Sequence, residues 1–141
     1  MSFLVDTNIL SELIKPEANV RVLAWIGQTP REKLYVSVIS LGEIRKGIAM
    51  LPPSFRKKRF TAWLEQVLLP WFQQRILPVD FSVAQRWGCL LARCPRTLPA
   101  VDMLLAATAL RHGLCVASRN TRDFHDVPDL PLVNPWSSDN P

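Results

Sequence analysis

The first candidate for chemistry is Asp6, which comes directly after the apolar run 3–5 and before Thr7 and Asn8. An apolar run followed by helix-capping residues is typical of a strand that leads into a helix, which puts the carboxylate at the carboxyl end of the strand. In open α/β sheets, ligands bind at this edge. One polar residue is enough to cap a helix, so two of the three are left for another role.

The second candidate is Asp102, the only charged residue between Arg96 and Arg111 in an otherwise apolar segment. A buried carboxylate without a partner is costly and normally escapes by taking up a proton. The dipole of a helix would offset only about 0.3–1 kcal/mol of that cost. A metal ion is the stronger compensation, so we expect a cation beside Asp102.

Glu43 has a structural explanation as well as a chemical one. Ser40 and Glu43 have the spacing of a capping box, and Ile39 with Ile44 would form the hydrophobic staple. A role in chemistry requires that Glu43 point across the edge of the sheet toward Asp6.

The segment 118–123 follows another strand-like run and contains Ser118, Asn120 and Asp123. Polar residues are common in loops. In a parallel sheet, however, the loops after the first and fourth strands can be neighbours at the switch point. Oxygen ligands without a histidine or cysteine cluster favour Mg²⁺ or Mn²⁺ over zinc.

Strands that alternate with helices must position these residues. The predicted strands cover residues 3–5, 34–39, 76–79, 114–117 and 132–133, with Pro78 indicating that the third lies at a sheet edge. The helices between them are predicted to end at or near Pro16, Gly27, Pro70 and Gly113. This order favours an α/β fold, a three-layer α/β/α domain with a parallel sheet of about five strands.

Length and composition set further limits. A chain of 141 residues, 48% of them hydrophobic, is predicted to form one domain over 1–141 with a loose tail at 137–141. No segment is long and apolar enough for a bilayer and no signal sequence is present, which predicts a cytoplasmic protein with no membrane contact. The three cysteines lack CxxC spacing and are predicted to be core thiols.

The chain is basic, with a net charge of +5, which is compatible with a polyanionic partner. The run 56–59 is most simply a solvated helix face. Together with Arg45, Lys46, Arg119 and Arg122, it could also hold phosphates near the carboxylates. GxSxG, P-loop and GxGxxG motifs are absent, which weighs against serine hydrolases, nucleotide kinases and dinucleotide enzymes.

Four segments taken in order resemble the PIN-domain nucleases, and more narrowly the VapC and FitB type of bacterial toxin. They are Leu4-Val5-Asp6-Thr7-Asn8, Ser40-Leu41-Gly42-Glu43, Ala100-Val101-Asp102 with Ala106-Ala107-Thr108-Ala109, and Ser118-Arg119-Asn120-Thr121-Arg122-Asp123-Phe124. The closing Asn134-Pro135-Trp136 is also similar to that subgroup.

The resemblance implies a homodimer, a ribonuclease activity that uses Mg²⁺ or Mn²⁺, and an antitoxin whose tail enters the active-site groove. It places three of the acidic positions on Asp6, Glu43 and Asp102, and the fourth on Asn120, where Asp123 is a possible substitute. Ser118 matches a hydroxyl that orients water. Transfer RNA is the substrate expected for the family.

The expected reaction is attack of a metal-activated water on an RNA phosphodiester, which leaves a 5′-phosphate and a 3′-hydroxyl. Two alternatives stay open. Asp6 after the first strand also fits a phosphohydrolase or phospho-acceptor domain of the aspartyl-phosphate type, although Asn8 stands where the haloacid dehalogenase pattern has a second Asp. Asn120 also fits a PIN-like protein that binds RNA or an antitoxin without catalysis.

Overall fold

A parallel five-stranded sheet forms the centre of the computed structural model, which describes residues 1–137. Its strands follow the order β3-β2-β1-β4-β5. They are β1 (Phe3–Val5), β2 (Leu34–Ser37), β3 (Ile76–Leu77), β4 (Cys115–Ala117) and β5 (Leu132–Val133). Val5 is paired with Ala117, so β1 and β4 end side by side at the centre. The predicted proximity of the loops after these two strands is therefore confirmed.

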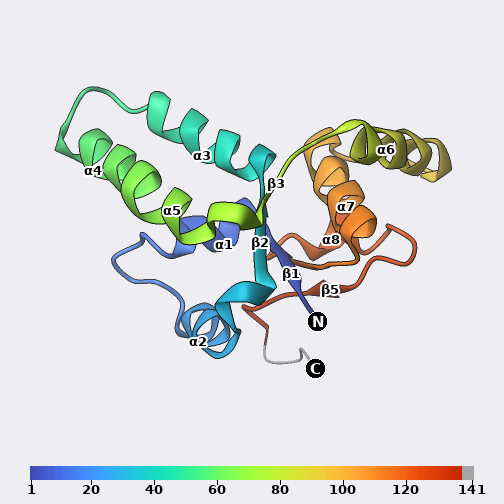
Figure 1. Ribbon diagram of the computed structural model, residues 1–141, viewed down its shortest axis with the longest axis horizontal. Coiled ribbons are helices and arrows are strands. Elements are labelled where there is room, and N and C mark those ends of the chain that lie inside the picture. Colours follow the sequence, from blue (N-terminus) through green and yellow to red (C-terminus); the bar gives the residue numbers. More distant parts are fainter. Residues whose placement is uncertain (138–141) are drawn as a thin grey trace.

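Eight α-helices cover the two faces of the sheet, with α1 to α5 on one side and α6 to α8 on the other (Figure 1). They are α1 (Thr7–Glu12), α2 (Val20–Gln28), α3 (Val38–Ala49), α4 (Phe55–Trp63), α5 (Leu69–Phe72), α6 (Phe81–Arg93), α7 (Ala100–His112) and α8 (Thr121–Phe124). Shorter helical segments are η1 (Arg31–Lys33), the π-helical η2 (Leu64–Leu68) and η3 (Gln73–Arg75). The predicted three-layer α/β/α arrangement is confirmed.

Each face of the sheet carries its own apolar core, because successive residues of a strand point to opposite faces. Val5 packs with Ile9 and Leu10 on the side of α1 to α5. Leu4 packs with Met103 of α7 on the other side. Asp6 therefore lies at the end of β1 between the two apolar cores, and this position sets the direction of its side chain.

The boundary between β2 and α3 differs from the prediction. The strand stops at Ser37, whose side chain caps α3 by accepting a hydrogen bond from the Ile39 amide at 3.0 Å. The predicted strand 34–39 is two residues too long, and the predicted capping box of Ser40 and Glu43 is wrong, since Ser40 lies inside α3. The start of α3 is therefore one turn earlier than the S-x-x-E spacing indicates, and Glu43 does not serve as a capping residue.

Proline and glycine positions account for other boundaries. Pro70 does not end the long helical stretch, which continues through α5 to Phe72. The π-helical η2 directly precedes α5, because proline has no N–H to donate to the preceding turn. Pro99 precedes α7 as its N-cap residue. Gly113 ends α7 in the left-handed conformation, with φ of 66°. β3 lies at the sheet edge, as Pro78 predicted.

Three further expectations can be compared with the structure. Cys115 is buried, but Cys89 is exposed, so the prediction of three core thiols is wrong. Ser137 donates its amide to the Asn134 carbonyl at 3.0 Å, and the rest of the predicted loose tail, 138–141, lies outside the described residues. Among residues 1–137, none of the helices combines the length and apolar character needed to cross a bilayer.

Candidate active site

A cavity of about 400 Å³ opens at the carboxyl ends of β1 and β4. Its wall combines residues from α1, α3, α7 and the segments that follow β4 and β5. The lining residues are Asp6, Thr7, Asn8, Ser11, Glu12, Lys15, Glu43, Asp102, Arg119, Asn120 and Trp136. The cavity therefore gathers the three predicted carboxylates, which are 37 to 96 positions apart in the sequence.

Asp6 is buried, with 6% of its surface exposed, and caps α1. Its Oδ1 accepts the Thr7 amide at 2.7 Å, and its Oδ2 accepts the hydroxyl of Ser118, also at 2.7 Å. Burial raises the pKa of Asp6 above its ordinary value, and the charge of Glu43 adds to this, while the two hydrogen bonds oppose it. The site therefore holds Asp6 in a fixed orientation but disfavours its negative charge.

The hydroxyl of Ser118 lies at the centre of a polar network under the cavity. It donates to Asp6 and accepts both the Asn8 amide at 3.2 Å and the backbone N–H of Asn120 at 2.9 Å. A hydroxyl has one donor and two acceptor positions, so this one is fully used. Ser118 thus joins the end of β1 to the loop after β4 and positions the Asp6 carboxylate.

Glu43 reaches the site from the first half of α3. Its Oε1 accepts a hydrogen bond from the Thr7 hydroxyl at 2.6 Å, across the edge of the sheet. This is the orientation that a chemical role required. Because Ser37 caps the helix instead of the predicted pair, the position of Glu43 is explained by Thr7 and the cavity.

Asp102 lies in the first turn of α7, and its Oδ2 accepts the side-chain amide of Asn120 at 2.8 Å. Asp102 makes no ion pair with any side chain of residues 1–137, so a metal ion beside it stays a prediction. Burial raises its pKa to about 6, with further contributions from the charges of Asp6, Asp123 and Glu43. Asp102 therefore holds its proton more strongly than an ordinary carboxyl group.

The two candidates for the fourth position have different environments. Asn120 lines the cavity and contacts Asp102, whereas Asp123 forms an ion pair with Arg96 at 3.0 Å. Arg96 also pairs with Asp126 at 2.7 Å, so it fixes α8 to the loop before α7. Asp123 acts on the site through its charge, while Asn120 contacts it directly.

The predicted phosphate-binding cations are Arg45, Lys46, Arg119, Arg122 and the run 56–59, and within the described residues Arg119 alone of these lines the cavity. Arg119 lies in its wall, but Arg45 pairs with Glu65 at 2.9 Å, and Lys46 and Arg122 are exposed without lining it. A role for Arg45, Lys46 and Arg122 in holding phosphates near the carboxylates stays a prediction.

Sequence reasoning missed Ser11, Glu12 and Lys15, which also line the cavity. Glu12 is 4% exposed although α1 is only six residues long. The signal was present: with Asn8, these residues follow the spacing i, i+3, i+4, i+7 of one helix face. The neighbouring apolar residues of α1 drew attention to the opposite, core-facing side.

The donor set of the cavity fits a hard divalent cation in chemistry, because it consists of carboxylate, amide and hydroxyl oxygens. In residues 1–137, no three Asp, Glu, His or Cys side chains are close enough to hold a metal ion together as they stand. Each carboxylate instead accepts a hydrogen bond from a neutral neighbour: Ser118 for Asp6, Thr7 for Glu43 and Asn120 for Asp102.

Comparison with known proteins gives consistent matches over almost the whole chain. The toxin FitB of Neisseria gonorrhoeae is 38% identical over 136 residues, covering 94% of this chain and 97% of FitB. The VapC ribonuclease Y4jK of Sinorhizobium fredii is 38% identical over 135 residues, covering 94% and 96%. The crystal structure of FitAcB from Neisseria gonorrhoeae superposes with a TM-score of 0.88, at 38% identity and 95% and 98% coverage.

The family profile described as PIN domain matches residues 3–130, a range that contains β1 to β4 and every acidic side chain of the cavity. A parallel sheet in the order β3-β2-β1-β4-β5, with acidic residues gathered where its central strands end, agrees with that match. The chain belongs to the PIN-domain family, and within it is similar to toxins of the FitB and VapC type.

Proposed function

We propose that this protein is a metal-dependent endoribonuclease and the toxin of a toxin-antitoxin pair. The observation that carries the proposal is that Asp6, Glu43 and Asp102 line one cavity although they come from three different elements. Relatives that match along the whole chain are named as a toxin and as a ribonuclease, which supports the same activity here.

The donor chemistry supports Mg²⁺ or Mn²⁺ as the cofactor, held by Asp6, Glu43, Asp102 and Asn120. When bound, such an ion supplies a water of lowered pKa and stabilises negative charge at a phosphodiester. Burial raises the pKa of Asp102 to about 6, so this group is mostly ionised at pH 7 and available to a cation.

The protein side chains have distinct roles in this proposal. Ser118 orients the carboxylate of Asp6, and Thr7 orients that of Glu43. Asn120 holds Asp102 toward the cavity through its side-chain amide. Hydrolysis that leaves a 5′-phosphate and a 3′-hydroxyl then follows from attack of water on the phosphorus, with the 3′ oxygen as leaving group.

The partners follow from the same proposal. Complexes named FitAB and FitAcB superpose with TM-scores of 0.89 and 0.88, which supports a cognate antitoxin for this chain. RNA as substrate, with transfer RNA as the family-level expectation, implies a cytoplasmic protein. A homodimer stays a prediction, which sedimentation of the purified protein would test.

Cleavage of RNA by the purified protein tests the proposal. We expect products with 5′-phosphate ends that require Mn²⁺ or Mg²⁺, and loss of cleavage by at least about a hundredfold in Asp6→Asn and Asp102→Asn. Glu32→Gln, an exposed carboxylate far from the cavity, is the matched control and should cleave normally.

Two results would replace this proposal with the alternatives. RNA binding without turnover at any Mn²⁺ concentration would identify a non-catalytic PIN-domain protein, for which Asn120 beside Asp102 is the supporting feature. A fluoroberyllate adduct on Asp6, seen by mass spectrometry, would identify an aspartyl-phosphate mechanism. Unchanged cleavage by Asp6→Asn or Asp102→Asn would reject the assigned active site.

A further inference from the structure

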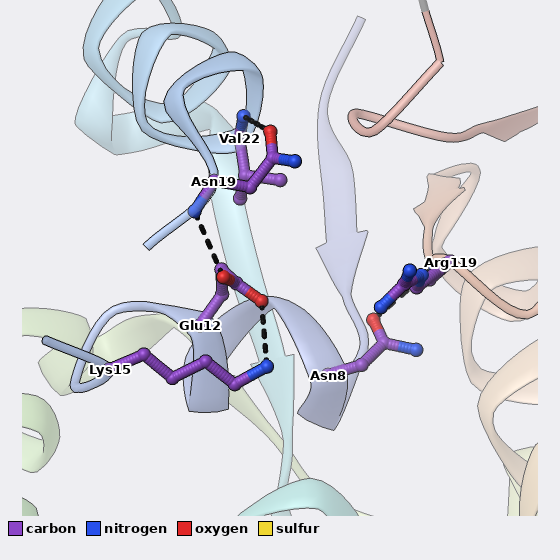
Figure 2. Close-up of polar contacts among 6 residues, drawn as sticks. All are labelled: Asn8, Glu12, Lys15, Asn19, Val22 and Arg119. Carbon is purple, nitrogen blue, oxygen red and sulfur yellow. Dashed lines mark hydrogen bonds and ion pairs between the residues drawn. The ribbon is translucent and has the colours of Figure 1, made fainter. Parts of the chain in front are cut away.

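One wall of the cavity contains an acidic residue that plays no part in the proposed reaction. Glu12 accepts the backbone N–H of Asn19 at 2.9 Å and the ammonium group of Lys15 at 3.1 Å (Figure 2). These two contacts lower the pKa of Glu12, and the charge of Arg119 lowers it further. Glu12 is therefore a carboxylate that favours its negative charge, in the same lining as the two cations, Lys15 and Arg119.

Lys15 keeps part of its capacity for a ligand. Its side chain is 55% exposed, and an ammonium group has three donors, of which one is directed at Glu12. Glu12 thus holds Lys15 at the cavity wall and leaves it free to contact a second anion.

Arg119 is exposed, and within residues 1–137 its guanidinium forms no ion pair with a carboxylate. Its backbone amide donates to the Asn8 side chain at 3.3 Å, and its guanidinium carbon lies 5.4 Å from the ring centroid of Trp136. Asn8 and Arg119 meet on the side of α1 that faces the loop after β4 (Figure 2). The cation is thus placed over an aromatic ring at the same cavity as the catalytic carboxylates.

The backbone of Trp136 is held by hydrogen bonds at both its N–H and its carbonyl group. Its amide donates to the Asn134 side chain at 2.9 Å, and its carbonyl accepts the Arg21 guanidinium at 3.3 Å. The ring is partly buried against the core on the side of α1 to α5. A partly exposed aromatic ring with a cation over it is a surface on which a planar group can stack.

The charges that line the cavity explain why positive groups are needed on this wall. Four carboxylates line the cavity, so a polyanion that approaches it is repelled unless fixed positive charges stand beside them. Lys15 and Arg119 are the two cations in the lining, and both lie near Glu12, which neutralises one of them. Within this wall the two cations outnumber Glu12 by one charge, whereas the whole lining, with four carboxylates and two cations, is formally negative by two, so a phosphate meets net positive charge only at this wall.

We propose that Lys15, Arg119 and Trp136 form a nucleotide subsite that accepts one unpaired nucleotide of RNA beside the cleaved phosphodiester. Lys15 and Arg119 bind the flanking phosphate, and the base stacks on the Arg119–Trp136 pair. Glu12 is a positioning residue for Lys15. A paired base is covered on both faces by its neighbours, so the subsite selects single-stranded RNA over duplex. This inference rests on the proposed ribonuclease function.

Binding of labelled RNA in the presence of EDTA tests the subsite without turnover. The probes are a short single-stranded RNA and the same strand annealed to its complement, with affinity measured by fluorescence anisotropy at several salt concentrations. We expect Trp136→Leu to weaken single-strand binding about tenfold and to leave duplex binding unchanged, because stacking requires an uncovered base. Trp136→Phe, which keeps an aromatic face, should retain most of the affinity.

The cations are tested by Arg119→Gln and Lys15→Gln. Each should weaken single-strand binding and reduce the slope of log affinity against log salt by about 0.7. Arg93→Gln removes an exposed arginine on α6, away from the cavity, and is the matched control, with unchanged affinity and slope beyond the general effect of charge. In turnover assays, Arg119→Gln should raise KM and leave kcat near the wild-type value.

The outcomes separate this inference from the proposed function. One set of results rejects the subsite and leaves the ribonuclease intact. In it the wild type cleaves RNA, Arg119→Gln binds the single strand as tightly as the wild type, and Trp136→Phe has the same single-strand affinity as Trp136→Leu. Failure of the wild type to cleave RNA, together with the expected losses in binding, rejects catalysis and keeps the subsite. An equal loss for single-stranded and duplex RNA in Trp136→Leu also overturns the inference, since it indicates general damage to the wall.

Discussion

The hydroxyl of Thr7 donates a hydrogen bond of 2.6 Å to the carboxylate of Glu43, which joins the first turn of α1 to α3 across the sheet edge. One of the two residues follows a central strand and the other lies inside a helix that starts at the neighbouring strand. This bond selects one orientation of Glu43 among those open to a side chain with three rotatable bonds. Thr7 is therefore a positioning residue for the proposed active site.

Thr7→Val should lower cleavage of RNA by about three- to tenfold in kcat with little change in KM, because a hydrogen bond to a charged group is worth about 1.5–3 kcal/mol and solvent replaces part of it here. Thr7→Ser keeps the hydroxyl and should restore most of the rate. Steady-state kinetics with a labelled RNA at saturating Mn²⁺ measure both. A Thr7→Val protein with the wild-type kcat would show that Glu43 needs no such support.

Two serines in the region 37–40 should respond in opposite ways to replacement by alanine. Ser37 caps α3, so Ser37→Ala should lower the free energy of unfolding by about 1 kcal/mol. The hydroxyl oxygen of Ser40 is buried and has no hydrogen-bond partner in the described part of the chain, so Ser40→Ala should be neutral or slightly stabilising. Urea unfolding of the two variants decides the matter, and the reverse order would favour the capping box predicted from the sequence.

The stability of the metal-free protein should fall as the pH rises through about 6. The pKa of Asp102 is raised from 3.8 to about 6 in the folded protein, mainly by burial, so folding favours its protonated form. That contribution is complete below pH 3.8 and is lost as the pH rises through 6, on the order of 1–2 kcal/mol after solvent screening. Asp6, also raised, acts in the same direction.

Urea unfolding in EDTA between about pH 4 and pH 8 measures this effect. Asp102→Asn removes the titrating group and should be less sensitive to pH than the wild type over this range. Added Mn²⁺ should restore wild-type stability above pH 6 and leave Asp102→Asn largely unchanged, because binding of a cation favours the ionised carboxylate. Parallel pH curves for the two proteins would contradict the assignment of this pKa shift to Asp102.

Asn120→Asp should convert the fourth position into a carboxylate. The 2.8 Å hydrogen bond between Asn120 and Asp102 would become a contact between two acidic groups, which should destabilise the metal-free protein at pH 8 by about 1–3 kcal/mol. Mn²⁺ affinity should rise by about tenfold, since an added charged ligand strengthens binding of a hard cation. Calorimetric titration with Mn²⁺ gives the affinity, and Gln85→Glu on the exposed side of α6 controls for added charge alone.

Most of the architecture could be predicted because its signals are local. The apolar runs, the proline and glycine positions and the alternation of strands with helices placed all five strands, and the topology of parallel sheets brought the loops after β1 and β4 together. Asp102 was conspicuous because it is charged within an apolar helix. Signals of this kind need no knowledge of which residues meet in space.

The parts that were missed depend on tertiary partners. Whether Ser37 or Ser40 caps α3 is decided by where β2 stops, which its pairing with β1 and β3 fixes. Arg45 has a side chain that suits phosphate binding, but it pairs with Glu65, which is 20 positions away in the sequence. The hydrogen bond between Asn120 and Asp102 was not predicted, because Asn120 comes within 2.8 Å only after β4 joins the sheet.

The position of β1 between β2 and β4 has a consequence for how the protein is made. β1, which directly precedes Asp6, is synthesised long before its neighbour β4, which begins at Cys115, and before the supporting Ser118. A nascent chain therefore has one side of β1 unpaired, and Asp6 without the hydroxyl of Ser118, until β4 and the residue after it have been synthesised. A chain that stops before β4 therefore lacks the hydroxyl that holds the Asp6 carboxylate at the cavity.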